Sequence, residues 1–252
     1  MPARRAHGDL PPLLALEGPS GAGKSSVSRA LGERLGATVL PEAFERIAPR
    51  PSLEFRTLEE LRSLELALLA AEIARFRDAE ALRARGSAVI LDTGPWGPLT
   101  YSWGLRETVA SQWDILPDLL TAARRHPGLE RFPLPELTVY LDVPEAVAAR
   151  RAASDPAGHP PGLQDRHRRV ARFERLLYLR TFPETLPARF LTVSGEPSPS
   201  QLAVGLADRL ERLGPLPTST GEESDRLLDA FAGASAAWDV PGGGEAGRSP
   251  KR

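Results

Sequence analysis

The chain has 252 residues, enough for one large domain with a well-buried core. Its hydrophobic fraction of 41% and charged fraction of 26% are ordinary for a globular protein. A net charge of −1 excludes a global field that would attract nucleic acid or an anionic membrane. The sequence contains no cysteine, which excludes disulfides, thiolate metal sites and cysteine nucleophiles.

The location of the protein is expected from its apolar segments. The first apolar stretch is interrupted by Pro11 and Glu17, which argues against a signal peptide. The most apolar later stretch, residues 64–74, contains Glu65 and Glu72 and is too short to cross a bilayer. We therefore expect a cytoplasmic protein with neither a membrane nor a nucleic-acid partner. A homodimer is compatible with the sequence, which does not fix the oligomeric state.

Short apolar runs alternate with longer amphipathic ones, a pattern typical of β–α–β units around a parallel sheet. In chain order, the pattern predicts strands at residues 13–17, 37–40, 88–91, 137–141 and 190–193. It predicts helices at residues 24–35, 58–85, 99–125, 144–151, 164–179 and 200–213.

Composition changes at both ends of this pattern. Residues 1–12 are expected to form a flexible N-terminus, and residues 13–213 one α/β domain of typical size. Residues 214–252 are rich in glycine, proline, serine and charge, and they are interpreted as a mostly disordered tail. One candidate helix lies within this tail, at residues 222–232.

A glycine-rich motif follows the first predicted strand and opens the first predicted helix. The sequence GPSGAGKS at residues 18–25 matches G-x-x-x-x-G-K-[ST] in full. Glycines let successive backbone N–H groups point inward at phosphate oxygens, at the positive end of a helix. We expect ATP to bind Gly18, Pro19, Ser20, Gly21, Ala22, Gly23, Lys24, Ser25 and the adjacent Ser26. Lys24 would bridge the β- and γ-phosphates, and the Ser25 hydroxyl would be a Mg²⁺ ligand.

Three acidic residues follow predicted strands and can face this loop, because a parallel sheet binds its ligand at the carboxyl ends of its strands. Asp92 is the candidate for the Mg²⁺-side catalytic acid, although capping of the following turn is the alternative. Glu42 is the candidate base for an acceptor hydroxyl, with a solvated loop acid as the alternative. Asp142 is as well explained by capping of the next helix.

Arginines flank a proline- and glycine-rich loop at residues 154–163. Guanidinium groups suit phosphate oxygens, and Arg150 is the candidate for stabilising the transferring group, with Arg151 and Arg166 as candidate ATP ligands. A solvated helix face is the alternative for all three. The histidines have no metal-ligand spacing and are interpreted as surface residues. Three aromatic residues suit either an acceptor pocket or the core: Trp96, Tyr101 and Trp103.

Several segments together resemble the thymidylate kinase and deoxynucleoside kinase superfamily: LALEGPSGAGKSS, a PE pair after the second strand, VILDTGPWGPLTYS, LTVYLDVPEAVAARR and the final FLTVSGE. The resemblance implies a three-layer P-loop NTPase fold with a five-stranded parallel sheet and helices on both faces. It also implies ATP and Mg²⁺ as cofactors, a kinase-like domain over residues 13–213, and an arginine-rich lid at about residues 150–169. Glu42 occupies the place of the base in deoxynucleoside kinases.

The sequence departs from this superfamily at three positions. Ala43 stands where deoxynucleoside kinases have proline, Thr93 where both branches have arginine, and Ser20 where thymidylate kinases usually have an acid. The expected activity is transfer of the γ-phosphoryl group of MgATP to a nucleoside, nucleotide or similar small molecule. A kinase of another metabolite or an antibiotic and a slow ATP-hydrolysing switch are the alternatives. Acceptor-dependent ATP turnover would distinguish a kinase from a switch.

Overall fold

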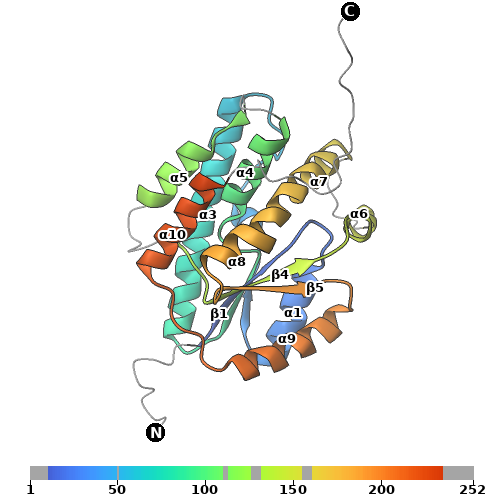
Figure 1. Cartoon of the computed structure of the whole chain (residues 1–252), viewed down its shortest axis with the longest axis vertical. Helices are drawn as coiled ribbons and strands as arrows, with labels where there is room; N and C mark the ends of the chain where they lie inside the picture. The colour runs from blue at the N-terminus through green and yellow to red at the C-terminus, as the bar shows by residue number, and fades with distance from the viewer. Residues whose placement is uncertain (1–10, 50, 110–112, 126–131, 155–160, 235–252) are drawn as a thin grey trace, which may run out of the picture.

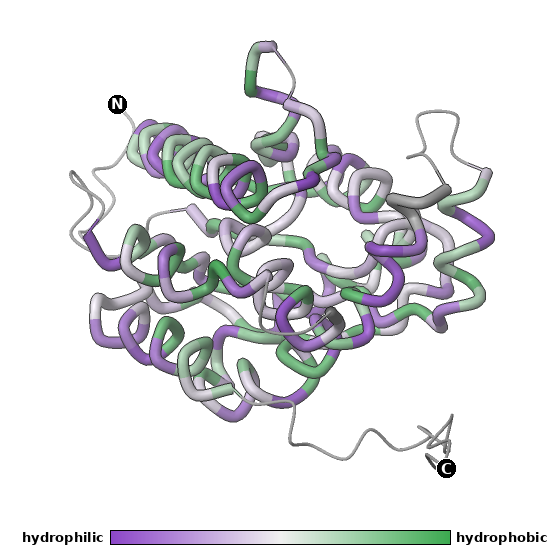
Figure 2. The backbone as a smooth tube through the Cα atoms, turned by 90° about the horizontal axis from the view of Figure 1, so that it is seen from above, coloured by the Kyte–Doolittle hydropathy of each residue, from purple (hydrophilic) through white to green (hydrophobic). Residues whose placement is uncertain are grey.

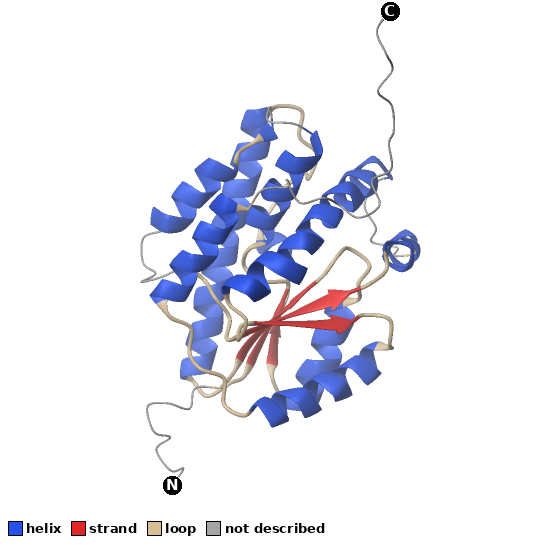
Figure 3. Cartoon of the chain, viewed as in Figure 1, coloured by secondary structure: helices blue, strands red, loops and turns tan. Residues whose placement is uncertain are grey.

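The computed structural model describes residues 11–49, 51–109, 113–125, 132–154 and 161–234. Its central sheet has five parallel strands in the order β2-β3-β1-β4-β5, which flank one another as Figure 3 shows. The strands are β1 (Leu13–Glu17), β2 (Thr38–Leu40), β3 (Val89–Asp92), β4 (Leu137–Asp142) and β5 (Phe190–Ser194). This architecture confirms the predicted α/β fold, and all five predicted strands are present with boundaries shifted by at most one residue.

Helices cover both faces of the sheet (Figure 1). One face packs against α1 (Lys24–Leu35) and α9 (Pro199–Leu213), which lie side by side. The opposite face packs first against α3 (Leu58–Ala84), through Phe76 and Ala79. The remaining helices build a thick second layer on this face: α4 (Gly97–Val109), α5 (Leu116–Arg125), α7 (Pro161–Leu176), π-helix η2 (Leu177–Thr181), α8 (Phe182–Thr185) and α10 (Gly221–Gly233). Two short helices flank the cavity described below: α2 (Ala43–Arg46) and α6 (Glu145–Ala153).

Local sequence signals explain where the principal helices begin and end. Gly36 ends α1 in the left-handed conformation, with φ of 62°. Thr57 and Glu60 form a capping box at the start of α3, each side chain bonding the other residue's backbone N–H. Seen from above, hydrophobic and hydrophilic stretches alternate along most helices, as amphipathic packing requires (Figure 2).

The helical material predicted over residues 99–125 consists of two helices in the structure. Helix α4 is described to Val109, and α5 begins at Leu116. Asp114 caps the second helix by accepting a hydrogen bond from the Leu116 N–H at 3.1 Å. Pro117 is in the first turn of α5, where its missing N–H costs nothing.

The interpretation of residues 214–252 as a mostly disordered tail needs correction for residues 214–234. The candidate helix is present as α10 and starts with a capping box between Thr220 and Glu223. Its apolar face is fully buried against the second layer, with Phe231 5.1 Å from Phe182 between ring centroids. The overall composition of residues 214–252 did not predict this buried face, because only a few apolar residues of α10 form it. Residues 235–252, like the N-terminal residues 1–10, lie outside the described residues.

Candidate functional site

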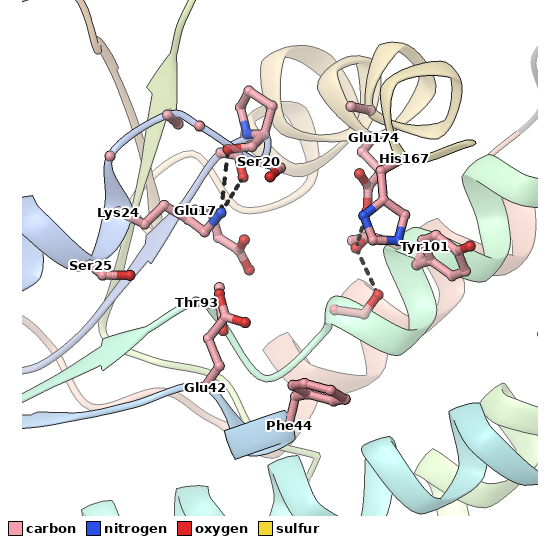
Figure 4. Close-up of a pocket in the computed structure, with 18 of the residues that line it drawn as sticks. Glu17, Ser20, Lys24, Ser25, Glu42, Phe44, Thr93, Tyr101, His167 and Glu174 are labelled. Atoms are coloured by element: carbon pink, nitrogen blue, oxygen red, sulfur yellow. Dashed lines mark hydrogen bonds between the residues drawn. The ribbon is translucent and has the colours of Figure 1, made fainter. Parts of the chain in front are cut away.

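The glycine-rich motif forms a compact loop between β1 and α1. Three glycines adopt positive φ angles, 146° at Gly18, 80° at Gly21 and 91° at Gly23. The Lys24 ammonium lies within the curl of the loop and donates to the Gly18 carbonyl at 2.9 Å and the Pro19 carbonyl at 3.4 Å (Figure 4). The cation therefore stands beside the loop's backbone, where phosphate oxygens would complete its hydrogen bonds.

The loop is also fixed from outside by α6. A Cβ atom added at Gly21 would lie 2.2 Å from the Ala148 carbonyl oxygen and 3.0 Å from the Ala152 nitrogen. Only glycine permits this approach, so the motif glycine serves both the turn and the contact between the loop and α6.

A cavity of about 840 Å³ opens over the loop at the carboxyl ends of the strands. Its nucleotide half is lined by the whole motif, by Arg151 of α6 and Ser154 directly after that helix, and by the loop between β5 and α9. Its other half, which we call the acceptor half, is lined by residues from α2, α3, α4 and α7. Its principal side chains are Glu42, Phe44, Phe55, Leu64, Glu65, Leu68, Glu72, Thr93, Tyr101, Arg166, His167 and Glu174.

The predicted arginines have different environments. Arg151 lines the nucleotide half, and its guanidinium donates to the Gly195 carbonyl at 2.9 Å and the Glu196 carbonyl at 3.2 Å. Arg150 is exposed and does not line the cavity. Arg166 lies on the acceptor half instead, with its guanidinium carbon 4.1 Å from the Phe55 ring centroid and a hydrogen bond of 2.6 Å to the Leu53 carbonyl.

The predicted lid coincides in part with α6 and α7, while residues 155–160 lie outside the described residues. Two bidentate ion pairs tie α7 to the sheet and to α6. Arg175 donates to both carboxylate oxygens of Asp142, at 2.7 and 2.8 Å. Arg172 donates to both oxygens of Glu145, each at 2.9 Å. These two arginines therefore join α7 to its neighbours and do not line the cavity.

The donor groups beside Lys24 fit MgATP. The Ser25 side chain is exposed at the start of α1 and lines the cavity, so its hydroxyl is available to a cation. Glu17, the last residue of β1, also lines the cavity and points into it in Figure 4. Hydroxyl and carboxylate oxygens together with phosphate oxygens are the hard ligands that Mg²⁺ prefers. Among the described residues, no group of three or more acids and histidines could hold a metal by itself.

Asp92, the predicted metal-side acid, does not line this cavity. Its side chain is buried behind the wall and accepts a hydrogen bond from the Ser28 hydroxyl at 3.3 Å. Sequence reasoning missed Glu17, an acid at the end of the neighbouring strand that does line the cavity. Its signal was a single glutamate closing an otherwise apolar strand, directly before the glycine motif.

The Glu17 carboxyl is buried and accepts a hydrogen bond from the Gly94 N–H at 2.8 Å. Burial raises the pKa of Glu17, while the positive charge of Lys24 and the Gly94 hydrogen bond oppose the rise. This bond links β1 to the turn after β3, and it orients the carboxyl between the loop and the acceptor half.

Thr93, which stands where the related kinases have arginine, has an unusual backbone. Its φ of 74° is a left-handed value that a β-branched residue rarely adopts. The Arg75 guanidinium holds this turn by donating to the Thr93 carbonyl at 2.8 Å and the Asp92 carbonyl at 3.1 Å. It also donates to the Pro41 carbonyl at 3.0 Å, so it joins the ends of β2 and β3. The side chain of Glu72 completes the arrangement, 2.6 Å from the guanidinium.

Glu42 follows β2 and its side chain points into the cavity from the side opposite the loop, next to Thr93 (Figure 4). Phe44 lies beside it on α2. The predicted residues Glu42, Lys24 and Ser25 thus line one cavity, whereas Asp92 and Arg150 lie outside it.

Three further acids of the acceptor half were missed because each lies on a helix without a motif. Burial raises the pKa of Glu65 to about 8, helped by the negative charge of Glu174 and opposed by Arg166. Burial likewise raises the pKa of Glu174 to about 7, opposed by a hydrogen bond of 3.0 Å from the Thr100 hydroxyl. The pKa of Glu72 rises to about 7 for the same reason, opposed by the charge of Arg75.

The structure places some of the predicted aromatic residues and histidines in the core and others at the cavity. Trp96 and Trp103 belong to the core of the second layer, with 0% and 2% of their surfaces exposed. Tyr101 lines the acceptor half and makes an edge contact with His167, at 5.6 Å between centroids. His167 is therefore a cavity residue, and its interpretation as a surface residue is wrong.

This geometry defines a P-loop nucleotide-binding domain. The protein-family model described as AAA domain matches residues 13–147, more than half of the chain. The chain therefore belongs to the AAA domain family. No curated protein matches its sequence. None of the helices in the described part of the chain combines the length and low polarity that a bilayer crossing demands.

Solved structures give the fold more specifically. Deoxyadenosine kinase from M. mycoides with bound dATP has a TM-score of 0.58 and 16% identity, over 79% of this chain and 99% of that one. The same enzyme with bound dCTP has a TM-score of 0.52 over the same shares. Thymidylate kinase from Candida albicans has a TM-score of 0.61 and 16% identity, over 84% and 96%. These matches confirm that the chain has the fold of P-loop nucleoside and nucleotide kinases.

Proposed function

We propose that this protein is an ATP-dependent phosphotransferase that moves the γ-phosphoryl group to a hydroxyl of a nucleoside-like small molecule. The observation that carries the proposal is one cavity with two chemically different halves. A phosphate-binding loop with its lysine lies on one side, and the Glu42 carboxylate faces it from the other. A domain that only hydrolyses ATP has no need for the second, enclosed half.

Each group that lines the cavity would have its own role in phosphoryl transfer. The backbone N–H groups of the loop and the Lys24 ammonium would bind the β- and γ-phosphates and stabilise charge in transfer. Glu42 would orient the acceptor hydroxyl and take its proton as the oxygen bonds to the γ-phosphorus. The bond from that phosphorus to the bridging oxygen breaks, and ADP leaves with the electron pair.

Ser25 and Glu17 would hold Mg²⁺, Glu17 directly or through water. The ion, when bound, would neutralise charge on the β- and γ-phosphates. Asp92 would contribute indirectly: it lies outside the cavity and accepts a hydrogen bond from Ser28, which holds the first turns of α1 in place. Arg151, already fixed by the loop after β5, would contact the nucleotide.

The test measures ADP release from MgATP with nucleosides and other hydroxyl compounds as acceptors, together with MgATP binding by calorimetry. We expect acceptor-dependent turnover that falls by at least 10²-fold in Lys24→Ala. Arg34→Ala is the matched control, since Arg34 is a cation of the same helix that is exposed and 3.8 Å from Asp208. MgATP hydrolysis that no acceptor stimulates would contradict the proposal and support the alternative switch.

Three expectations from the sequence stay predictions: the cytoplasmic location, the homodimer and the use of Mg²⁺. A further one, the absence of a nucleic-acid partner, rests on net charge alone.

A further inference from the structure

The acceptor half is unusual in its charge. Five acids line it, on three elements: Glu42 and Glu45, Glu65 and Glu72, and Glu174. Lys24 and Arg151 lie on the nucleotide half, so Arg166 is the one arginine or lysine among the described residues of the acceptor half. A phosphate monoester placed there would meet mainly carboxyl groups and few cations.

Arg166 is engaged only in part, because its buried Nε has no hydrogen-bond partner among the described residues. One of its terminal nitrogens donates to the Leu53 carbonyl, and its plane lies over the Phe55 ring. Arg75, which lies behind this half on α3, is 0% exposed and is enclosed by Glu72 and four carbonyl groups. Arg75 therefore offers no bidentate fork to a phosphate monoester, and Arg166 is left as a single cation among five acids.

Glu65 is the group without a partner. Its residue is only 4% exposed, yet it lines the cavity. Within the described part of the chain, no hydrogen bond or ion pair engages its carboxyl. A buried carboxyl without a partner is costly, which suggests that a ligand supplies the missing partner.

Glu174 faces the same space from α7, opposite Glu65 on α3. The negative charge of Glu174 raises the pKa of Glu65, and the Thr100 hydroxyl donates to one oxygen of Glu174 at 3.0 Å, the one hydrogen bond to this carboxyl within the described part of the chain. The buried Tyr101 hydroxyl has no hydrogen-bond partner among the described residues, although the charge of Arg166 acts on it, and Phe44 and Tyr101 add aromatic walls. Two acids between aromatic rings are a favourable site for a cationic nitrogen, which gains both ion pairs and cation–π contacts.

We propose that the acceptor is a hydroxyl compound without phosphate that presents a cationic nitrogen group to Glu65 and Glu174. This inference rests on the proposed function and specifies its substrate class. The acceptor's hydroxyl reaches toward Glu42 while its nitrogen group lies between α3 and α7. Acceptors that already carry phosphate are rejected by the same acids.

The experiment compares matched acceptors by kcat/KM for ADP release. One set is thymidine, 3′-amino-3′-deoxythymidine and thymidine 5′-monophosphate. The other is 3,3-dimethylbutan-1-ol, choline and phosphocholine, in which the cationic and neutral compounds have nearly the same shape. We expect the cationic member of at least one set to exceed its neutral counterpart by tenfold or more, with no measurable turnover of the phosphorylated members.

Two variants identify the residues responsible. Glu65→Gln keeps the shape but removes the charge, and it should reduce the preference for the cationic member to less than threefold. Glu174→Gln provides the same test from α7. Glu59→Gln is the matched control, because Glu59 is on the same helix with its side chain 76% exposed, and it should keep the full preference.

The outcomes separate the inference from the proposed function. Equal use of the neutral members, preferred use of a phosphorylated member, or an unchanged preference in both variants would overturn the inference and leave a kinase. No turnover with any acceptor, despite MgATP binding, would overturn both.

Discussion

The Arg75 guanidinium lies 2.8 Å from the carbonyl oxygen of Thr93, the residue with a left-handed backbone. The same side chain bonds the ends of β2 and β3, which carry Glu42 and Thr93 into the cavity. One buried arginine of α3 thus positions the two segments that face the acceptor. A left-handed threonine costs about 1–3 kcal/mol, and these bonds supply the constraint that retains it.

Arg75→Met should lower the free energy of unfolding by about 3–5 kcal/mol, because it leaves Glu72 as a buried acid without its partner. Urea unfolding measures this loss. The double variant Arg75→Met, Glu72→Leu should recover part of it. If the free energy of unfolding of the single variant fell by less than about 1 kcal/mol, the ion pair would contribute little to stability.

Gly21→Ala should weaken MgATP binding at least tenfold, because its methyl group would collide with the Ala148 carbonyl and its φ of 80° disfavours alanine. Gly205→Ala is the matched control: Gly205 is in α9 and a Cβ there meets nothing within 4 Å. That control should be stabilised by about 0.5–1 kcal/mol. Calorimetric titration with MgATP and thermal unfolding distinguish the two. Equal ATP affinity in both variants would contradict the tight contact with α6.

Glu17→Gln should reduce turnover by at least tenfold while the fold persists, since the amide can still accept from the Gly94 N–H but cannot bind Mg²⁺ as a carboxylate does. The Mg²⁺ concentration that gives half-maximal rate should rise. Asp92→Asn is the comparison, and it should change that concentration less, because Asp92 does not line the cavity. The reverse ranking would restore Asp92 as the metal-side acid.

Stability should depend on pH through the acids of the acceptor half. The folded-state pKa of Glu65 is about 8 against an ordinary value of 4.5, so the folded state binds its proton more tightly than the unfolded state. This contribution to stability is complete below about pH 4.5 and is lost as the pH rises through 8. Glu72 and Glu174 act in the same direction, with pKa values of about 7.

Urea unfolding at pH 6 and pH 9 measures this dependence. We expect a lower free energy of unfolding at pH 9, and a smaller difference in Glu65→Gln, which cannot ionise. Glu59→Gln should keep the full difference, since its side chain is 76% exposed. An undiminished pH dependence in Glu65→Gln would show that its carboxyl is not the group that titrates.

Truncation separates the two parts of the C-terminal region. Ending the chain after Ala234 should leave the melting temperature nearly unchanged. Ending it after Gly214 removes the buried Leu227 and Phe231 and a hydrogen bond from the Trp103 indole to the Ala234 carbonyl. We expect this shorter chain to lose several kcal/mol, since each large apolar side chain contributes about 2–5 kcal/mol. Equal stability of both truncations would contradict the packing of α10.

The sequence predicted the sheet and the phosphate loop well because both depend on local patterns. Five apolar runs and one glycine motif contain the whole signal, and the loop's lysine is fixed by spacing alone. The acceptor half was largely missed because its residues come from separate helices. Glu65 and Glu174 are 109 positions apart in number and meet only when α3 and α7 pack over the sheet. Asp92 was assigned from its position after a strand, but pleating turns its side chain behind the wall.

Helix α10 also constrains how the protein is made. Phe231 contacts Phe182, and the backbone at Ala234 bonds Trp103 and Arg106 of α4, the helix that carries Tyr101. During synthesis this layer stays open until residue 234 has left the ribosome, although the phosphate loop near the start of the chain emerges far earlier. The nascent chain therefore presents its phosphate loop well before helix α4, which carries Tyr101, gains its support from the end of α10.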